Sequence, residues 1–121
     1  MKKILIVDDL AEVRDLVEVT LRVEYYKILQ AKSGEEGIKI AKAEKPDLII
    51  MDVMMPGGMD GLEATRIIKN DPETKDCTVI MLTAKGQEAD KKKGLEAGAA
   101  DYFSKPFSPL ELINKVEEIL R

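Results

Sequence analysis

The stretch Ile4-Leu5-Ile6-Val7-Asp8-Asp9 decides the fold, because it joins a continuous apolar run to two adjacent carboxylates. Two more continuous apolar runs follow along the chain, Leu48-Ile49-Ile50-Met51 and Val79-Ile80-Met81-Leu82, and segments with helical spacing lie between the runs. A strand without polar residues is covered on both faces, which is typical of a parallel sheet. The alternation of strands and helical segments therefore predicts an α/β fold with parallel strands.

Two weaker strand candidates complete a set of five. The segment Tyr26-Lys27-Ile28-Leu29 alternates in polarity, which suits a strand at a sheet edge, and Tyr102-Phe103 is short. Each connection between successive strands is longer than the roughly twelve residues that a parallel crossover requires. The five strands can therefore all run in one direction.

The last helix has the clearest start signal. Ser108-Pro109-Leu110-Glu111 offers an N-cap, a proline for the first turn and a capping-box glutamate. We expect its apolar face to consist of Leu110, Ile113, Val116 and Leu120. The helix expected between Gln87 and Ala97 has the poorest pattern, because Lys91-Lys92-Lys93-Gly94 interrupts it.

Composition and charge narrow the possible functions. With 121 residues, 45% of them apolar, the chain is expected to form a single domain over residues 1–121 without disulfides or other staples. Lys and Arg number 19 against 23 Asp and Glu, and this net negative charge would repel the phosphates of a nucleic acid. We therefore expect no direct contact with nucleic acid.

Four absences narrow the possible functions further. The single cysteine, Cys77, cannot form an internal disulfide, and the sequence has neither an export leader nor an apolar run long enough to cross a membrane. A cytoplasmic protein without membrane contact is the expectation. The chain contains no histidine, which excludes Ser-His-Asp hydrolysis and His-ligated zinc, so any chemistry must use carboxylates, lysines and hydroxyls.

Three carboxylates follow two of the predicted strands. Asp8 and Asp9 come directly after the first strand, and Asp52 comes directly after the third. Ligands of open parallel sheets gather outside the carboxyl ends of the strands. If the first and third strands are neighbours, the three carboxylates meet there, and they can all stay ionised only with a cation among them. Oxygen ligands without His or Cys favour Mg²⁺.

Two further polar groups follow the fourth and fifth strands. Thr83 supplies a hydroxyl, and Lys105 supplies a mobile cation suited to a phosphate oxygen. The bond between Lys105 and Pro106 is a candidate for the cis form, which would direct the ammonium group into the crevice. Carboxylates, a metal ion, a hydroxyl and an ammonium group at one sheet edge indicate phosphoryl transfer to a carboxylate.

At these positions the sequence resembles the response-regulator receiver family, the CheY-like phosphoacceptor domains of two-component signalling. The resemblance spans the whole chain. It is carried by residues 4–9, 47–52 and 98–107, together with Met55-Pro56, Met59-Asp60-Gly61 and Leu82-Thr83-Ala84. The resemblance implies a doubly wound, flavodoxin-like (βα)5 fold, whose five parallel strands lie in the order 2-1-3-4-5.

The resemblance also implies which residues carry the chemistry. Asp52 would accept the phosphoryl group from a histidine of a sensor kinase or phosphotransfer protein, and the lack of histidine in this chain fits a donor imidazole supplied in trans. Asp9, Asp52 and the backbone carbonyl of Met54 would hold Mg²⁺, with Asp8 acting mainly through a metal-bound water. The domain would catalyse its own phosphorylation and dephosphorylation without being an enzyme on an outside substrate.

A conformational switch is implied as well. Lys105 would pair with one phosphoryl oxygen, and Thr83 would move to hydrogen-bond another. Tyr102 would then turn inward and alter the surface formed by the fourth helix, the fifth strand and the fifth helix, where a downstream output protein or domain would bind. The resemblance leaves open a monomer or a phosphorylation-dependent dimer, and a stand-alone receiver or a receiver from a longer protein.

The sequence departs from the family pattern in one loop. The family usually has one residue between Met-Pro and Met-Asp-Gly, whereas this chain has two, Gly57 and Gly58. Met54 and Lys85 occupy the positions that tune self-hydrolysis of the acyl phosphate in this family. Neither side chain is a good water-orienting carboxamide or carboxylate, so we expect a long-lived phosphorylated state.

Other interpretations of the same residues remain open at this point. Asp9 could cap the first helix, and Asp8 could be a solvated turn residue. The chain could be a receiver-like scaffold that binds partners without phosphorylation. A flavodoxin-type FMN binder would need a hydroxyl- and glycine-rich loop where Asp8-Asp9-Leu10 is anionic, and an aspartyl phosphatase or mutase would need an Asp-x-Asp signature.

Overall fold

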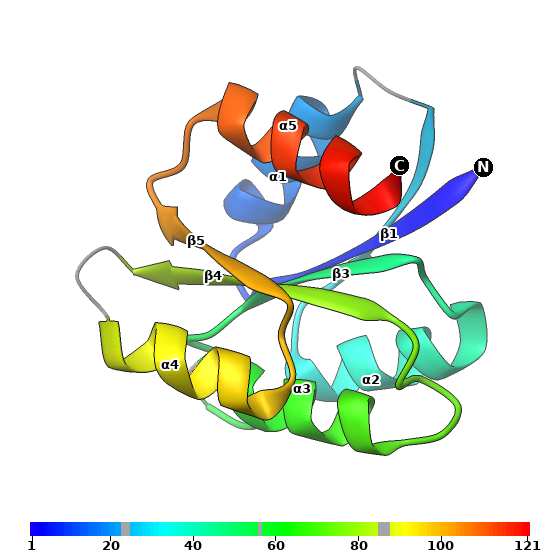
Figure 1. Ribbon diagram of the computed structural model, residues 1–121, viewed down its shortest axis with the longest axis vertical. Coiled ribbons are helices and arrows are strands. Elements are labelled where there is room, and N and C mark those ends of the chain that lie inside the picture. Colours follow the sequence, from blue (N-terminus) through cyan, green and yellow to red (C-terminus); the bar gives the residue numbers. More distant parts are fainter. Residues whose placement is uncertain (23–24, 56, 85–87) are drawn as a thin grey trace.

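The computed structural model describes residues 1–22, 25–55, 57–84 and 88–121, in which strands and helices alternate regularly (Figure 1). The strands are β1 (Lys2–Val7), β2 (Tyr26–Ala31), β3 (Leu48–Asp52), β4 (Thr78–Ala84) and β5 (Asp101–Lys105). The helices are α1 (Ala11–Leu21), α2 (Gly34–Glu44), α3 (Gly61–Asn70), α4 (Glu88–Ala97) and α5 (Pro109–Leu120). The predicted alternation of five strands and five helices is confirmed.

The strands form one parallel sheet in the order β2-β1-β3-β4-β5, as the resemblance implies. Helices α1 and α5 lie on one face of the sheet, and α2, α3 and α4 lie on the other (Figure 1). The chain leaves β1 toward β2 in one direction and reaches β3 on the other side of β1. The winding therefore reverses between β1 and β3, and the carboxyl ends of these two strands flank the crevice where such folds bind ligands.

The three continuous apolar runs are the buried centre of the sheet. Their twelve residues, Ile4–Val7, Leu48–Met51 and Val79–Leu82, are all 0% exposed. Alternate residues enter opposite cores, so that Ile4 packs with α1 and α5 while Leu5 packs with α2 and α3. Each fully buried leucine or isoleucine contributes roughly 2 kcal/mol to stability, which holds the ends of these strands firmly in place.

Polar side chains begin three of the helices. Ser33, Asp60 and Ser108 each accept a hydrogen bond from the backbone N–H three residues further on. The predicted start of α5 is thereby confirmed, with Pro109 as its first residue. Leu10 precedes α1 and makes no such bond, so Asp9 is not the cap of this helix. Within the described ranges, no helix is long and apolar enough to span a bilayer.

Candidate functional site

Three carboxylates meet at the carboxyl ends of β1 and β3. These strands are direct neighbours, Asp52 is the last residue of β3, and Asp8 and Asp9 follow β1. One carboxylate oxygen from each residue lies within 4.8 Å of the others. Asp8 and Asp52 are buried and Asp9 is half-buried, so the cluster opens to solvent on the Asp9 side. The structure brings together the carboxylates that the sequence predicts to converge.

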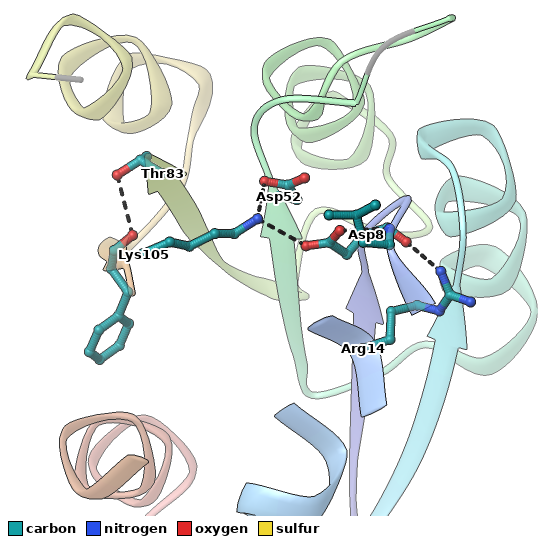
Figure 2. Close-up of polar contacts among 7 residues, drawn as sticks. Asp8, Arg14, Asp52, Thr83 and Lys105 are labelled. Carbon is teal, nitrogen blue, oxygen red and sulfur yellow. Dashed lines mark hydrogen bonds and ion pairs between the residues drawn. The ribbon is translucent and has the colours of Figure 1, made fainter. Parts of the chain in front are cut away.

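Lys105 supplies the positive charge of this cluster. It ends β5, at the edge of the sheet, and its long side chain reaches across to β3 and β1 (Figure 2). The Nζ atom lies 2.9 Å from Oδ1 of Asp52 and 3.1 Å from Oδ2 of Asp8. The peptide bond between Lys105 and Pro106 is cis, as the sequence suggests. One ammonium group therefore bridges two buried carboxylates.

For both Asp52 and Lys105, burial and the hydrogen bond between them shift the pKa in opposite directions. Burial raises the pKa of Asp52 from 3.8 to about 6, the hydrogen bond from Lys105 opposes this rise, and the negative charge of Asp8 adds to it. Burial lowers the pKa of Lys105, but its hydrogen bond to Asp52 and the two nearby carboxylates outweigh that effect and leave the pKa raised. Lys105 therefore stays protonated, and the pocket keeps an excess of negative charge.

Backbone and side-chain contacts hold Asp8 in place. Its N–H donates to the Ala31 carbonyl at 3.1 Å, and its Oδ1 accepts from the Leu10 N–H at 2.9 Å. The guanidinium Nη1 of Arg14 donates to the Asp8 carbonyl at 2.8 Å (Figure 2). Asp8 is thus a buried, fixed residue rather than a solvated turn residue. Sequence reasoning missed Arg14, because a basic residue in the first turns of a helix is usually solvated.

Thr83 and Tyr102 lie on the neighbouring strands β4 and β5. The Thr83 side chain is fully buried, and its hydroxyl donates to the Phe103 carbonyl at 3.3 Å (Figure 2). Tyr102 is half-buried against the core on the side of α2, α3 and α4. The ammonium of Lys91 lies 4.7 Å from the centroid of its ring. Both candidate switch residues therefore have defined contacts that a movement would have to break.

The loop after β3 contains the additional glycine. Gly57 has φ +89°, in the left-handed region that glycine adopts readily. The loop is tied to the start of α2, because the Met59 N–H donates to Glu35 Oε1 at 3.1 Å. A small hollow of about 60 Å³ lies between this loop and Asp9. Gly57 and Gly58 thus line a hollow that Asp9 also borders.

The predicted roles of Met54 and Lys85 stay predictions. The Met54 side chain is 63% exposed, and the expectation that its carbonyl binds metal stays a prediction. Lys85, the other residue expected to tune hydrolysis, lies outside the described residues, as does Pro56 of the loop motif.

The donor set fits Mg²⁺. Its ligands in proteins are oxygens, commonly from one or two carboxylates, with water molecules completing the shell. Asp9 and Asp52 offer two carboxylates, of which Asp9 lies at the open side of the cluster, and Asp8 lies beside them. Burial, together with the negative charge of Asp8, raises the pKa of Asp52, and a divalent cation bound there would oppose this rise.

Comparisons with known proteins place the chain in a family. The model of the response regulator receiver domain matches residues 4–117. The chain is 46% identical over 120 residues to the phosphate regulon transcriptional regulatory protein PhoB of Pseudomonas aeruginosa, covering 99% of this chain and 52% of that protein. It is 47% identical over 119 residues to the transcriptional regulatory protein ResD of Bacillus subtilis, covering 98% of this chain and 48% of that protein. The chain therefore spans about half the length of these curated relatives.

Solved structures agree with the sequence comparisons. A putative response regulator from Chloroflexus aurantiacus matches with a TM-score of 0.93 and 41% identity, over 98% of this chain and 97% of that one. The chemotaxis protein CheY4 of Vibrio cholerae matches with a TM-score of 0.90 and 32% identity, over 98% of both chains.

The chain belongs to the response regulator receiver family. It is a receiver domain of the two-component type, and its relatives are regulators rather than classical enzymes. The family match supports a phosphoacceptor role and does not favour the phosphorylation-independent scaffold, the FMN binder or the aspartyl phosphatase.

Proposed function

We propose that Asp52 accepts a phosphoryl group from a histidine of a sensor kinase or phosphotransfer protein in a Mg²⁺-dependent reaction. The observation that carries this proposal is the convergence of Asp8, Asp9 and Asp52 within 4.8 Å, with Lys105 bridging two of them. Such a pocket combines a carboxylate nucleophile with the positive charge that a phosphoryl group requires.

Each residue of the pocket then has a part in the transfer. Asp9, Asp52 and the Met54 carbonyl would hold Mg²⁺, and Asp8 would act mainly through a metal-bound water. When bound, Mg²⁺ neutralises charge on the carboxylates and on the phosphoryl oxygens. An Asp52 oxygen forms the new bond to phosphorus as the bond to the donor imidazole breaks. Lys105, which already contacts Asp52 Oδ1, moves onto a phosphoryl oxygen.

The transfer would be read out through Thr83 and Tyr102. The Thr83 hydroxyl exchanges its 3.3 Å bond to the Phe103 carbonyl for a charge-assisted bond to the phosphoryl group, which is the stronger of the two. Tyr102 then leaves its place beneath Lys91 and turns inward. The resulting change alters the surface of α4, β5 and α5, on which an output protein or domain would bind.

The proposed partners follow from this chemistry. They are a sensor kinase or phosphotransfer protein upstream and an output partner downstream, in the cytoplasm and with the domain as a monomer or a phosphorylation-dependent dimer. The relatives twice the length of this chain are named transcriptional regulatory proteins, so an output segment on the same polypeptide is one form that this partner can take. We propose no nucleic-acid contact by the receiver domain itself.

Intact-mass spectrometry tests the proposal. The protein is incubated with phosphoramidate or acetyl phosphate and Mg²⁺, and the controls are EDTA, Asp52→Asn and the exposed-site variant Asp76→Asn. We expect a gain of one phosphoryl group in the wild type and in Asp76→Asn, and none in Asp52→Asn or with EDTA. Phosphorylation of Asp52→Asn to the wild-type level would contradict the assignment of the acceptor.

A further inference from the structure

Arg14 connects α1 to the turn that carries two of the three carboxylates. It lies in the first half of α1, and its Nη1 donates to the Asp8 carbonyl at 2.8 Å (Figure 2). That carbonyl belongs to the peptide group that joins Asp8 to Asp9. A hydrogen bond to it fixes the plane of this peptide group and so the direction in which the chain continues to Asp9.

A residue of the sheet holds the Arg14 side chain in place. Its Nε donates to Oε1 of Gln30 at 3.0 Å, and Nε2 of Gln30 donates to Oε1 of Glu18 at 2.8 Å. Gln30 belongs to β2 and pairs in register with Ile6 of β1. A continuous set of hydrogen bonds therefore runs from the sheet through Arg14 to the turn.

The start of α1 depends on Asp8 as well. Its N-cap residue, Leu10, makes no side-chain cap, so the helix start is held by backbone bonds and by Asp8 Oδ1. The Arg14 guanidinium adds a charged donor, whose hydrogen bonds are stronger than those between neutral groups.

We propose that Arg14 is a positioning residue of the acidic pocket, which fixes the peptide group between Asp8 and Asp9 and thereby strengthens the binding of Mg²⁺. This inference rests on the proposed metal role of these aspartates. Residues that orient metal ligands without touching the metal commonly change its affinity by about 10–100-fold when they are replaced.

A positioning role and a purely electrostatic role predict opposite signs. A guanidinium near the pocket repels a divalent cation, so removing its charge alone would tighten Mg²⁺ binding. Loss of the hydrogen bond to the Asp8 carbonyl would instead loosen the turn and weaken Mg²⁺ binding. The direction of the change in Kd therefore distinguishes the two.

The test measures the Kd for Mg²⁺ by isothermal titration calorimetry in the wild type and in Arg14→Met. Gln30→Met is a second variant, which keeps the Arg14 charge but removes the hydrogen bond between Arg14 and Gln30. Lys92→Met serves as the charge control, because Lys92 is exposed on α4. Val17→Ala serves as the stability control, because it removes buried packing from the same helix.

We expect Arg14→Met to raise the Kd about tenfold and Gln30→Met to raise it by a smaller factor, with Lys92→Met and Val17→Ala unchanged. An unchanged or lower Kd in both Arg14→Met and Gln30→Met, with normal binding by the wild type, would overturn this inference alone. Absence of Mg²⁺ binding by the wild type would overturn the proposed metal role and this inference with it. A Kd raised as much in Val17→Ala as in Arg14→Met would also overturn this inference, because a general loss of protein stability would then explain the change in Kd.

Discussion

The Nζ atom of Lys105 lies 2.9 Å from Oδ1 of Asp52 and 3.1 Å from Oδ2 of a second buried carboxylate, Asp8. Burial of Asp52 outweighs its hydrogen bond from Lys105, and the pKa of Asp52 remains raised, at about 6. In the metal-free protein, the ionised form of Asp52 therefore lowers the stability of the fold. This feature suits a site whose function is to bind a cation and a phosphoryl group.

Replacement of Asp52 by asparagine is expected to stabilise the metal-free protein at neutral pH. Because the pKa of Asp52 is raised from 3.8 to about 6 in the folded state, that state binds the proton more tightly than the unfolded chain does. The free energy of unfolding therefore falls as the pH rises from about 4 to about 6, by roughly 3 kcal/mol for the full shift. Asparagine does not ionise, so Asp52→Asn removes this pH-dependent loss of stability.

Urea unfolding followed by circular dichroism in EDTA measures the effect. We expect Asp52→Asn to be more stable than the wild type by about 1–3 kcal/mol near pH 7 and equally stable near pH 4. A difference that is the same at both pH values would show that ionisation of Asp52 is not its cause.

Removal of the Lys105 ammonium should have the opposite effect. Lys105→Met leaves two buried carboxylates without their cation, and we expect a loss of about 2 kcal/mol at neutral pH in EDTA. Mg²⁺ should restore part of this stability, because it binds the folded state and supplies positive charge. The same unfolding experiment with and without Mg²⁺ checks this, with Lys92→Met at an exposed position as control. An equal loss in both conditions would argue against a metal site beside Lys105.

The central strands were predictable because a strand that is buried on both faces of the sheet consists of consecutive apolar residues. The three runs of apolar residues correspond to β1, β3 and β4. β5 is longer than the predicted Tyr102-Phe103, since it continues through Lys105. Its backbone pairs with β4, and such pairing needs no particular side chain at a sheet edge.

The apolar face of α5 was predicted only in part. Leu110 is 65% exposed, whereas Val116 is buried as expected and the unpredicted Leu112 is buried as well. In the first turn Leu112 rather than Leu110 enters the core, so the buried face of the helix lies beside the predicted one.

The carboxylates and Lys105 could be found because each ends a strand or follows one, at the edge where ligands of this fold bind. Arg14 could not be found in the same way. Its partner is a backbone carbonyl, and a hydrogen bond to a carbonyl selects no residue type at that position.

Gly61 has a packing requirement that Gly58 lacks. A Cβ added to Gly61 would lie 2.0 Å from the Asp52 carbonyl oxygen, whereas one added to Gly58 would lie 3.5 Å from the nearest atoms, the carboxylate oxygens of Glu35. We expect Gly61→Ala to destabilise the protein by about 3 kcal/mol and to slow phosphorylation, because the β3 backbone must move. Gly58→Ala should change stability by less than about 0.5 kcal/mol.

Thermal unfolding and the rate of phosphoryl uptake from phosphoramidate measure both effects. Equal stability and uptake in the two variants would show that the close approach of Gly61 to Asp52 imposes no constraint.

The lifetime of the phosphorylated state tests the role of Met54. We expect the wild type to lose its phosphoryl group slowly and Met54→Asn to lose it about tenfold faster, because a carboxamide can orient the attacking water. The decay is followed by intact mass after removal of the donor, and Leu16→Asn, another change of an exposed apolar residue, is the control. Rapid loss in the wild type would contradict the expectation of a long-lived state.

The position of the phosphoryl group tests the central claim most directly. Borohydride reduces an aspartyl phosphate to homoserine, so treatment of the phosphorylated protein followed by peptide mass spectrometry identifies the modified residue. We predict homoserine at position 52 alone, formed only when both Mg²⁺ and a phosphoryl donor were present. Homoserine at position 8 or 9 instead, with residue 52 unmodified, would contradict the account.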